Sequence, residues 1–139
     1  MIYPCIVLVE KGFYGHNDLK VENILLRKKG ETDIVLCDFG TAVLRNTSRR
    51  TMAIGTPATM AKETWKGRSL KADSYAIGCI TYELLTGKLL DGPIQPQHLA
   101  SKELTRASSQ LQRFVKDSTR TEPSERFSLH ELLEHPFIR

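Results

Sequence analysis

Apolar residues in this chain fall into short runs near its beginning and into helical spacings in its second half. The run Ile6–Val9 favours a strand by propensity, and the tail of a helix fits the same pattern, so periodicity alone leaves both open. Two further apolar runs, 23–26 and 34–37, flank a polar stretch that contains Gly30. Such a pair of runs around a turn-rich stretch predicts a β-hairpin.

Residues 40–71 show no sustained period and are rich in Thr, Ser, Gly and Arg. They predict a long loop, and long loops in compact domains are usually functional. The spacing of Ile77, Ile80 and Leu84 then places these side chains on one face of a helix, which Gly87 is positioned to end.

Two further helices are predicted towards the C-terminus. Ser128 and Glu131 form a capping-box pattern at the start of a short helix that Pro136 closes. The other helix follows Ser109, and one of its faces carries Leu111, Phe114, Val115 and Ser118. The pattern as a whole predicts one domain over residues 1–139, mainly α with a short β-hairpin.

Composition supports a folded domain and excludes several classes of protein. The chain has 139 residues, of which 40% are hydrophobic and 26% charged, which is typical of a globular domain and not of a disordered tail. The net charge of +4 favours phosphate-bearing partners weakly. The basic residues are scattered without interleaved aromatic residues, so we expect no nucleic-acid partner.

We also expect no membrane partner and no disulfide framework. The apolar run Cys5–Val9 is far shorter than the roughly 18 residues that span a bilayer, and nothing near it reads as a signal peptide. Cys5, Cys37 and Cys79 are odd in number and widely spaced. Reduced thiols of this kind predict a cytoplasmic or nuclear protein.

The residues with the clearest chemistry lie in 16–23 and 38–40, on either side of the predicted hairpin. Phosphoryl transfer needs an acceptor for the hydroxyl proton, positive charge near the migrating group, and oxygen ligands for Mg²⁺. The hairpin folds the second stretch back beside the first. Suitable residues are Asp18 as the base, Lys20 as the charge, and Asn23 with Asp38 as the ligands.

These motifs give the chain its resemblance to a known family. HNDLKVEN, DFG and AKE stand in the order of the protein-kinase signatures HRDLxxxN, DFG and APE. From His16 onwards the chain resembles the C-terminal, substrate-binding lobe of a eukaryotic serine/threonine protein kinase. Four further elements are similar to that family's, namely Gly55–Pro57, Asp73–Gly78, Arg126 and His135–Ile138.

The resemblance implies a role for each matching residue. Asp18 is expected to be the catalytic base, and Lys20 with Thr56 to bracket the hydroxyl of a protein substrate. Asn23 and Asp38 are expected to hold Mg²⁺, while ATP is the second substrate and Leu25 the floor under its adenine. Lys20 and the Gly-Thr-Pro sequence are similar to serine/threonine rather than tyrosine kinases.

The remaining implied roles are structural. His16 and Phe39 are expected to stack inside the lobe, and Glu63 to form a buried ion pair with Arg126. Asp73 is expected to tie the catalytic loop to the helix that it begins, although a helix cap explains this residue as well. The activation segment is expected to run over residues 38–63.

The chain departs from the family at four matching positions. Val21 replaces a proline, Thr59 stands where an aromatic residue is common, and Lys62 interrupts Ala-Pro-Glu. Asn17 replaces the arginine that receives the activation-loop phosphate. The presence of Asn17 counts against control by phosphorylation at Thr47, Ser48 or Thr51. Arg49, Arg50 and Thr51 form either a phosphorylation switch or a solvated charged loop.

The 139 residues contain no Gly-x-Gly-x-x-Gly loop and no strand lysine with a helical glutamate partner. We therefore expect the N-terminal lobe to be absent from this chain. Two hypotheses follow. The chain is part of an active kinase completed by an N-terminal lobe, or it is a non-catalytic lobe that acts as a protein-binding scaffold or regulatory module.

Overall fold

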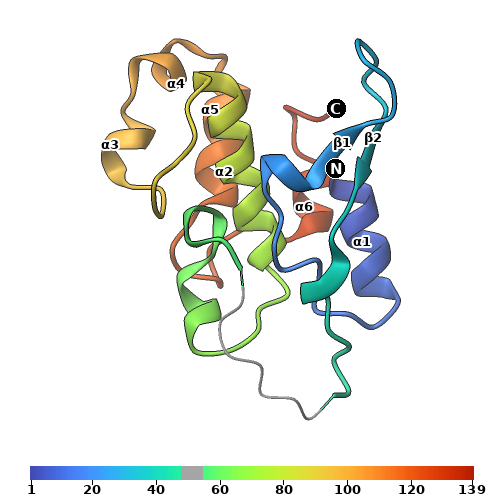
Figure 1. The fold of residues 1–139 in the computed structure, drawn as a ribbon. Helices are drawn as coiled ribbons and strands as arrows, with labels where there is room; N and C mark the ends of the chain where they lie inside the picture. Colours follow the sequence, from blue (N-terminus) through green and yellow to red (C-terminus); the bar gives the residue numbers. More distant parts are fainter. Residues whose placement is uncertain (48–54) are drawn as a thin grey trace.

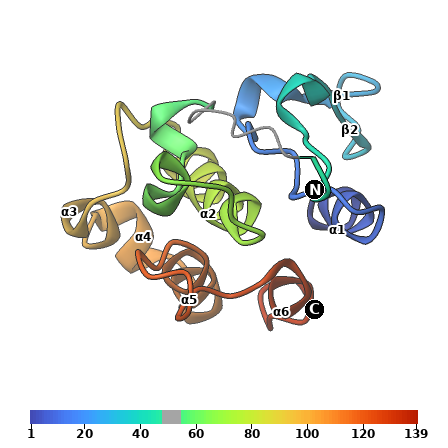
Figure 2. The same ribbon diagram turned by 90° about the horizontal axis from the view of Figure 1, so that it is seen from below.

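The computed structural model describes residues 1–47 and 55–139, and it is mainly α-helical with one two-stranded sheet (Figures 1 and 2). This confirms the predicted mainly-α fold with a short β-hairpin. The elements are α1 Ile2–Glu10, β1 Ile24–Leu26, β2 Ile34–Leu36, α2 Ala72–Thr86, α3 Pro96–Leu99, α4 Lys102–Arg106, α5 Ser109–Ser118 and α6 Leu129–Leu133. Within the described ranges no helix has the length and apolarity needed to cross a membrane.

The first element is a helix, so of the two structures that the pattern left open for Ile6–Val9, the helical one holds and the strand favoured by propensity does not. Ile2, Cys5 and Ile6 are its buried residues. Their i, i+3, i+4 spacing forms one helical face, and α1 packs against α6. Tertiary packing therefore overrides the strand propensity of the β-branched residues.

The hairpin prediction is confirmed. β1 and β2 pair antiparallel with Ile24 opposite Leu36 and Leu26 opposite Ile34. The backbone N–H of Arg27 donates to the carbonyl of Asp33 at 3.0 Å and extends the pairing into the turn. The end of β2 is thereby held beside the segment that precedes β1.

Helix α2 runs through the middle of the molecule and packs against α4, α5 and α6 (Figures 1 and 2). Ile77 and Ile80 are buried, and Gly87 ends the helix with a positive φ of 68°, as predicted. Leu84, which shares the predicted helix face with Ile77 and Ile80, is 69% exposed. The apolar face of α2 is therefore covered at Ile77 and Ile80 and left uncovered near its C-terminal end, at Leu84.

The later helices begin at or within one residue of the predicted positions. α5 follows Ser108, whose side chain accepts from the backbone N–H of Leu111, and it buries Phe114, Val115 and Ser118. Ser128 and Glu131 form the capping box of α6. Residues 40–71, predicted as a long loop, contain only short 3₁₀ turns in their described part, at Phe39–Thr41, Pro57–Thr59 and Lys62–Trp65.

The contact between α2 and α5 depends on Gly78. A Cβ atom on this glycine would lie 2.2 Å from Ser118 Oγ and 2.6 Å from Thr119 Cγ2. Ser118 Oγ donates to the carbonyl of Phe114 at 2.6 Å, so it is not free to move away. The two helices can approach this closely only because residue 78 has no side chain.

We expect Gly78→Ala to lower the free energy of unfolding. Overpacking a core costs about 1–3 kcal/mol, and alanine's higher helix propensity offsets roughly 1 kcal/mol of that cost. Gly92→Ala is the matched control, because no atom lies within 4 Å of the Cβ that it would add. Urea denaturation should show a lower midpoint for Gly78→Ala alone, and equal midpoints would contradict the close helix contact.

Candidate active site

Asp18, Lys20 and Thr56 meet although Thr56 lies 36 positions after Lys20. Thr56 Oγ1 donates to Asp18 Oδ1 at 2.8 Å. Lys20 Nζ donates to the same hydroxyl at 3.2 Å and lies 3.4 Å from Asp18 Oδ2. A carboxylate that already accepts a hydrogen bond from a hydroxyl, with an ammonium beside it, has the chemistry of a base poised for an alcohol.

Asn23 and Asp38 lie at the two ends of the hairpin. Asn23 is buried, and its Nδ2 donates to the carbonyl of Asp18 at 2.9 Å. Its backbone carbonyl accepts from the N–H of Cys37 at 3.0 Å, so the end of β2 is fixed beside the loop that carries Asp18. Asp38 is exposed and has a left-handed φ of 60°.

The oxygens of these two residues fit Mg²⁺ in part. Because the Asn23 amide nitrogen is engaged with Asp18, its Oδ1 is the atom left to bind a cation. One Asp38 oxygen accepts a long hydrogen bond of 3.4 Å from the Gly40 N–H. An amide oxygen and a carboxylate are ligands that Mg²⁺ accepts, and it keeps waters or phosphate oxygens in its other positions. In the described part of the chain no group of three or more His, Cys, Asp or Glu side chains could hold a metal.

Asp73 anchors the loop that begins at His16. Its carboxylate accepts from the backbone N–H groups of His16 at 2.7 Å and Asn17 at 2.9 Å. Burial raises the pKa of this carboxyl, and the two backbone hydrogen bonds oppose that rise. The residue before α2 is Lys71 and it makes no side-chain cap, so Asp73 lies in the first turn as an anchor, not at the cap position.

Gly15 makes this anchor possible, and sequence reasoning missed its role. Its φ is +147°, and a Cβ at this position would lie 2.4 Å from Asp73 Oδ2. The residue before His16 therefore has to be glycine for the loop to reach the carboxylate. The only signal in the sequence was that Gly15 directly precedes the HNDLKVEN motif. The need for glycine comes from Asp73, which lies 58 positions further along the chain.

His16 is fully buried and joins the loop that carries Asp18 to the segment after β2. Its Nε2 lies 2.9 Å from the carbonyl of Cys37, and its own carbonyl accepts from Thr41 Oγ1 at 2.7 Å. The rings of His16 and Phe39 are 5.0 Å apart and inclined by 51°. Phe39 is 47% exposed, so the expectation that both rings pack inside the lobe is wrong for Phe39. Thr41 was not singled out from the sequence.

Arg126 forms an ion pair with Glu63 across 63 positions of sequence. Its guanidinium donates to Glu63 Oε1 at 2.6 Å and to Oε2 at 3.1 Å, and its side chain is 0% exposed. Further N–H groups donate to the carbonyls of Arg120, Thr121 and Lys71. Lys71, which the sequence did not point to, donates through Nζ to the carbonyl of Arg126 at 2.5 Å. The 3₁₀ turn that holds Glu63 is thus fixed to the loop before α6.

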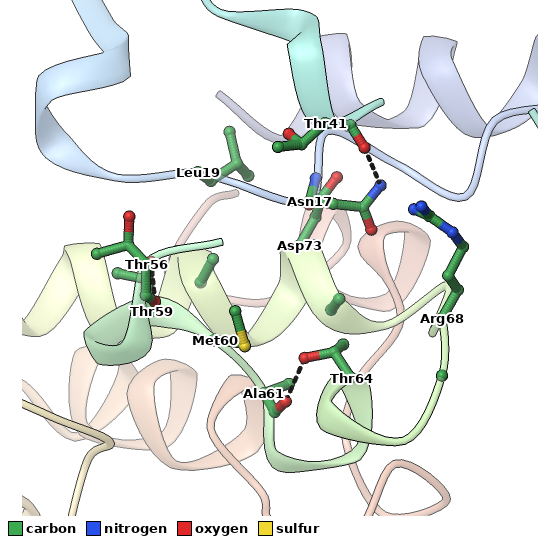
Figure 3. Close-up of a pocket in the computed structure, with 13 residues that line it drawn as sticks. Asn17, Leu19, Thr41, Thr56, Thr59, Met60, Ala61, Thr64, Arg68 and Asp73 are labelled. Atoms are coloured by element: carbon green, nitrogen blue, oxygen red, sulfur yellow. Dashed lines mark hydrogen bonds between the residues drawn. The ribbon is translucent and has the colours of Figure 1, made fainter. Parts of the chain in front are cut away.

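Two of the departures from the kinase pattern line one cavity of about 30 Å³ (Figure 3). Asn17 and Thr59 both contribute to its wall, together with small residues of α2. Asn17 Nδ2 donates to the carbonyls of Gly15 and Thr41, so its side chain is held in place and brings no positive charge. The cavity is large enough for a water molecule.

Leu25 and Thr47 are both exposed, Leu25 to the extent of 50%. Thr47 Oγ1 donates to the carbonyl of Leu44 at 2.7 Å. The candidate phosphorylation positions Ser48 and Thr51, with Arg49 and Arg50, lie outside the described residues.

Comparisons with known proteins show the family of the chain. Residues 9–138 match the model of the protein kinase domain. The chain is 34% identical over 137 residues to the serine/threonine-protein kinase pakA of Talaromyces marneffei, covering 88% of this chain and 21% of that protein. It is 34% identical over 138 residues to shk1/pak1 of Schizosaccharomyces pombe, covering 89% and 21%. It is 37% identical over 134 residues to mouse serine/threonine-protein kinase 36, covering 88% and 10%.

The chain therefore spans about a fifth or less of the length of these relatives. The family match, in contrast, covers nearly all of it. This chain belongs to the protein kinase family.

Proposed function

We propose that this chain is the C-terminal lobe of a serine/threonine protein kinase domain. Joined to an N-terminal lobe, it transfers the γ-phosphoryl group of Mg-ATP to a serine or threonine hydroxyl of a protein. The observation that carries the proposal is the contact of Asp18, Lys20 and Thr56, which come from separate parts of the chain. Its location is proposed to be cytoplasmic or nuclear, from the thiol pattern alone.

Each residue has a defined part in this proposal. Asp18 accepts the proton of the substrate hydroxyl, whose place is marked by the Thr56 hydroxyl that the carboxylate now binds. Lys20 sets positive charge beside the attacking oxygen and the migrating group. Asn23 and Asp38 would hold Mg²⁺, which neutralises phosphate charge when it is bound. Asp73 positions the loop that carries Asp18.

One observation favours a second candidate function, that of a non-catalytic protein-binding lobe. Leu25, Leu26 and Phe39 expose 50, 57 and 47% of their surfaces beside the candidate site. Exposed apolar residues in one region are typical of a surface that another protein covers. On this reading the chain is a catalytically inactive lobe that acts as a scaffold or regulatory module.

Nucleotide binding tests the proposal. For the 139-residue chain alone we expect no resolvable change in melting temperature at about 1 mM Mg-ATP. A ligand present at 100 times its Kd stabilises by about 2.7 kcal/mol, which shifts the midpoint by roughly 10 °C for a domain of this size. The chain lacks a glycine-rich loop to cover the phosphates, and Leu25 faces solvent.

The same chain joined to the N-terminal lobe of its Schizosaccharomyces pombe relative should show a shift of that order. This rise in melting temperature should require Mg²⁺ and should be smaller for the joined protein that carries Asp38→Asn. A clear Mg²⁺-dependent shift in the lone chain would contradict the need for a second lobe. No shift in the joined protein would contradict the nucleotide site.

A further inference from the structure

Positive charge is concentrated between Asp38 and Asp73. This stretch holds one acidic residue, Glu63, and seven basic residues, Arg45, Arg49, Arg50, Lys62, Lys66, Arg68 and Lys71. Its excess of six positive charges is larger than the net charge of +4 of the whole chain. The rest of the chain is therefore slightly acidic, and the excess of positive charge in the sequence falls within this stretch.

The 3₁₀ turn Lys62–Trp65 sorts its side chains between the inside and the surface. Glu63 pairs with Arg126, and Thr64 donates to the carbonyl of Ala61 and lines the cavity of Figure 3. Lys62 and Trp65 are three positions apart, which in a 3₁₀ helix places them on one side. Both are exposed, Trp65 to the extent of 59%.

Lys66 follows at once and is exposed as well. We call Lys62, Trp65 and Lys66 the Trp65 patch. Among the residues that the structure describes, no carboxylate lies within 4.0 Å of either lysine. Residues 48–54 contain no Asp or Glu, and the one acidic side chain of the turn is directed inwards to Arg126. The patch thus presents two uncompensated ammonium groups beside a large exposed aromatic ring.

We propose that the Trp65 patch binds an acidic segment of a partner protein. Carboxylates of such a segment pair with Lys62 and Lys66, and an apolar side chain among them covers the Trp65 ring. Aromatic side chains with complementary charges around them are the usual anchors of protein interfaces. The inference goes beyond phosphoryl transfer, because this binding needs no nucleotide and uses none of the residues assigned to chemistry.

Trp65 makes the test direct because it is the only tryptophan in the chain. The probe is a synthetic peptide of about ten residues with alternating Glu and Leu, and the measurement is the emission of Trp65 in the full chain. We expect a saturable blue shift, which weakens strongly when NaCl is raised from about 50 to 500 mM because exposed charges are screened. The same peptide with Gln in place of Glu should cause no shift.

Charge reversal supplies the matched variants. Lys62→Glu with Lys66→Glu should weaken peptide binding by about tenfold or more at low salt. Lys29→Glu with Lys102→Glu makes the same change in net charge at exposed lysines outside the patch, and it should leave binding within about twofold. Circular dichroism checks that both variants are folded.

Several results would overturn the inference. They are no emission change in the unmodified chain at about 1 mM peptide, equal weakening by both pairs of substitutions, and a shift that high salt does not reduce. Equal binding of an oligothymidylate with the same number of charges would show a general affinity for polyanions in place of an acidic protein segment. The salt and Gln-peptide arms use the unmodified chain, so they remain decisive if a variant fails to fold.

Discussion

Replacement of Arg126 by alanine is expected to lower the free energy of unfolding by about 3–5 kcal/mol, the usual cost of removing one partner of a buried ion pair. The guanidinium makes two hydrogen bonds to Glu63 and three to backbone carbonyls, and no part of it is exposed. The variant leaves Glu63, whose side chain is 21% exposed, without its counterion. A loss of this size is comparable with the total stability of many domains.

Arg106→Ala is the matched control. Arg106 is exposed at the end of α4, and surface substitutions of this kind change stability by about 0.5 kcal/mol or less. Urea denaturation followed by circular dichroism measures both. The joining of the Glu63 turn to the α6 loop by this ion pair would be refuted if the two variants unfolded at the same urea concentration.

Acid should reduce the difference in the free energy of unfolding between the Arg126→Ala variant and the unmodified chain. Burial by itself would raise the pKa of Glu63, but the hydrogen bonds from Arg126 outweigh it and hold the pKa below its ordinary value of 4.5. A carboxyl whose folded pKa is depressed stabilises fully above its unfolded pKa, and the stabilisation is lost as pH falls through the folded value. The difference in the free energy of unfolding that urea denaturation measures at about pH 7 should therefore be smaller at about pH 3.

Asp18→Asn is expected to lower kcat by about 10²–10⁴-fold in the chain joined to an N-terminal lobe, the range that general-base catalysis contributes. Asparagine keeps the size of the side chain and can still accept from the Thr56 hydroxyl, but it cannot take the substrate proton. The KM for ATP should change little, because Asp18 is not among the residues assigned to Mg²⁺ or nucleotide. This split between kcat and KM separates loss of the base from loss of binding.

Asp91→Asn is the control for this experiment, since Asp91 is exposed and remote in sequence from the candidate site. Steady-state rates with a protein substrate measure both variants. Full turnover by Asp18→Asn would remove Asp18 from the role of base. Equal loss in both variants would point to an indirect effect of charge.

The parts of the fold that the sequence predicted depend on local signals. The hairpin was predicted from the polar turn between its two apolar runs, and the start of α6 from its capping box. The end of α2 was predicted from Gly87, which has a left-handed φ. Pattern could not decide between strand and helix at Ile6–Val9, because the packing of α1 against α6 depends on residues more than a hundred positions away. The exposure of Leu84 could not be predicted either, since periodicity places a residue on a helix face without saying whether that face is covered.

The candidate site divides in the same way. Asp18, Lys20 and Asn23 stand in one contiguous motif, so spacing was enough to single them out. Gly15 and Gly78 are required by close approach to Asp73 and Ser118, and such clashes exist only in three dimensions. The pairing of Thr56 with Lys20 came from family resemblance, because no local period links positions 36 apart.

The most direct test of the account is phosphate transfer by this chain joined to the N-terminal lobe of its Schizosaccharomyces pombe relative. The joined protein is incubated with γ-labelled ATP and a mixed protein substrate, with Mg²⁺ or with EDTA, and the labelled amino acids are identified. We predict label on serine and threonine that requires Mg²⁺ and is absent with Asp18→Asn. A joined protein that binds Mg-ATP but transfers no phosphate above background would contradict the proposed kinase function and support the non-catalytic alternative.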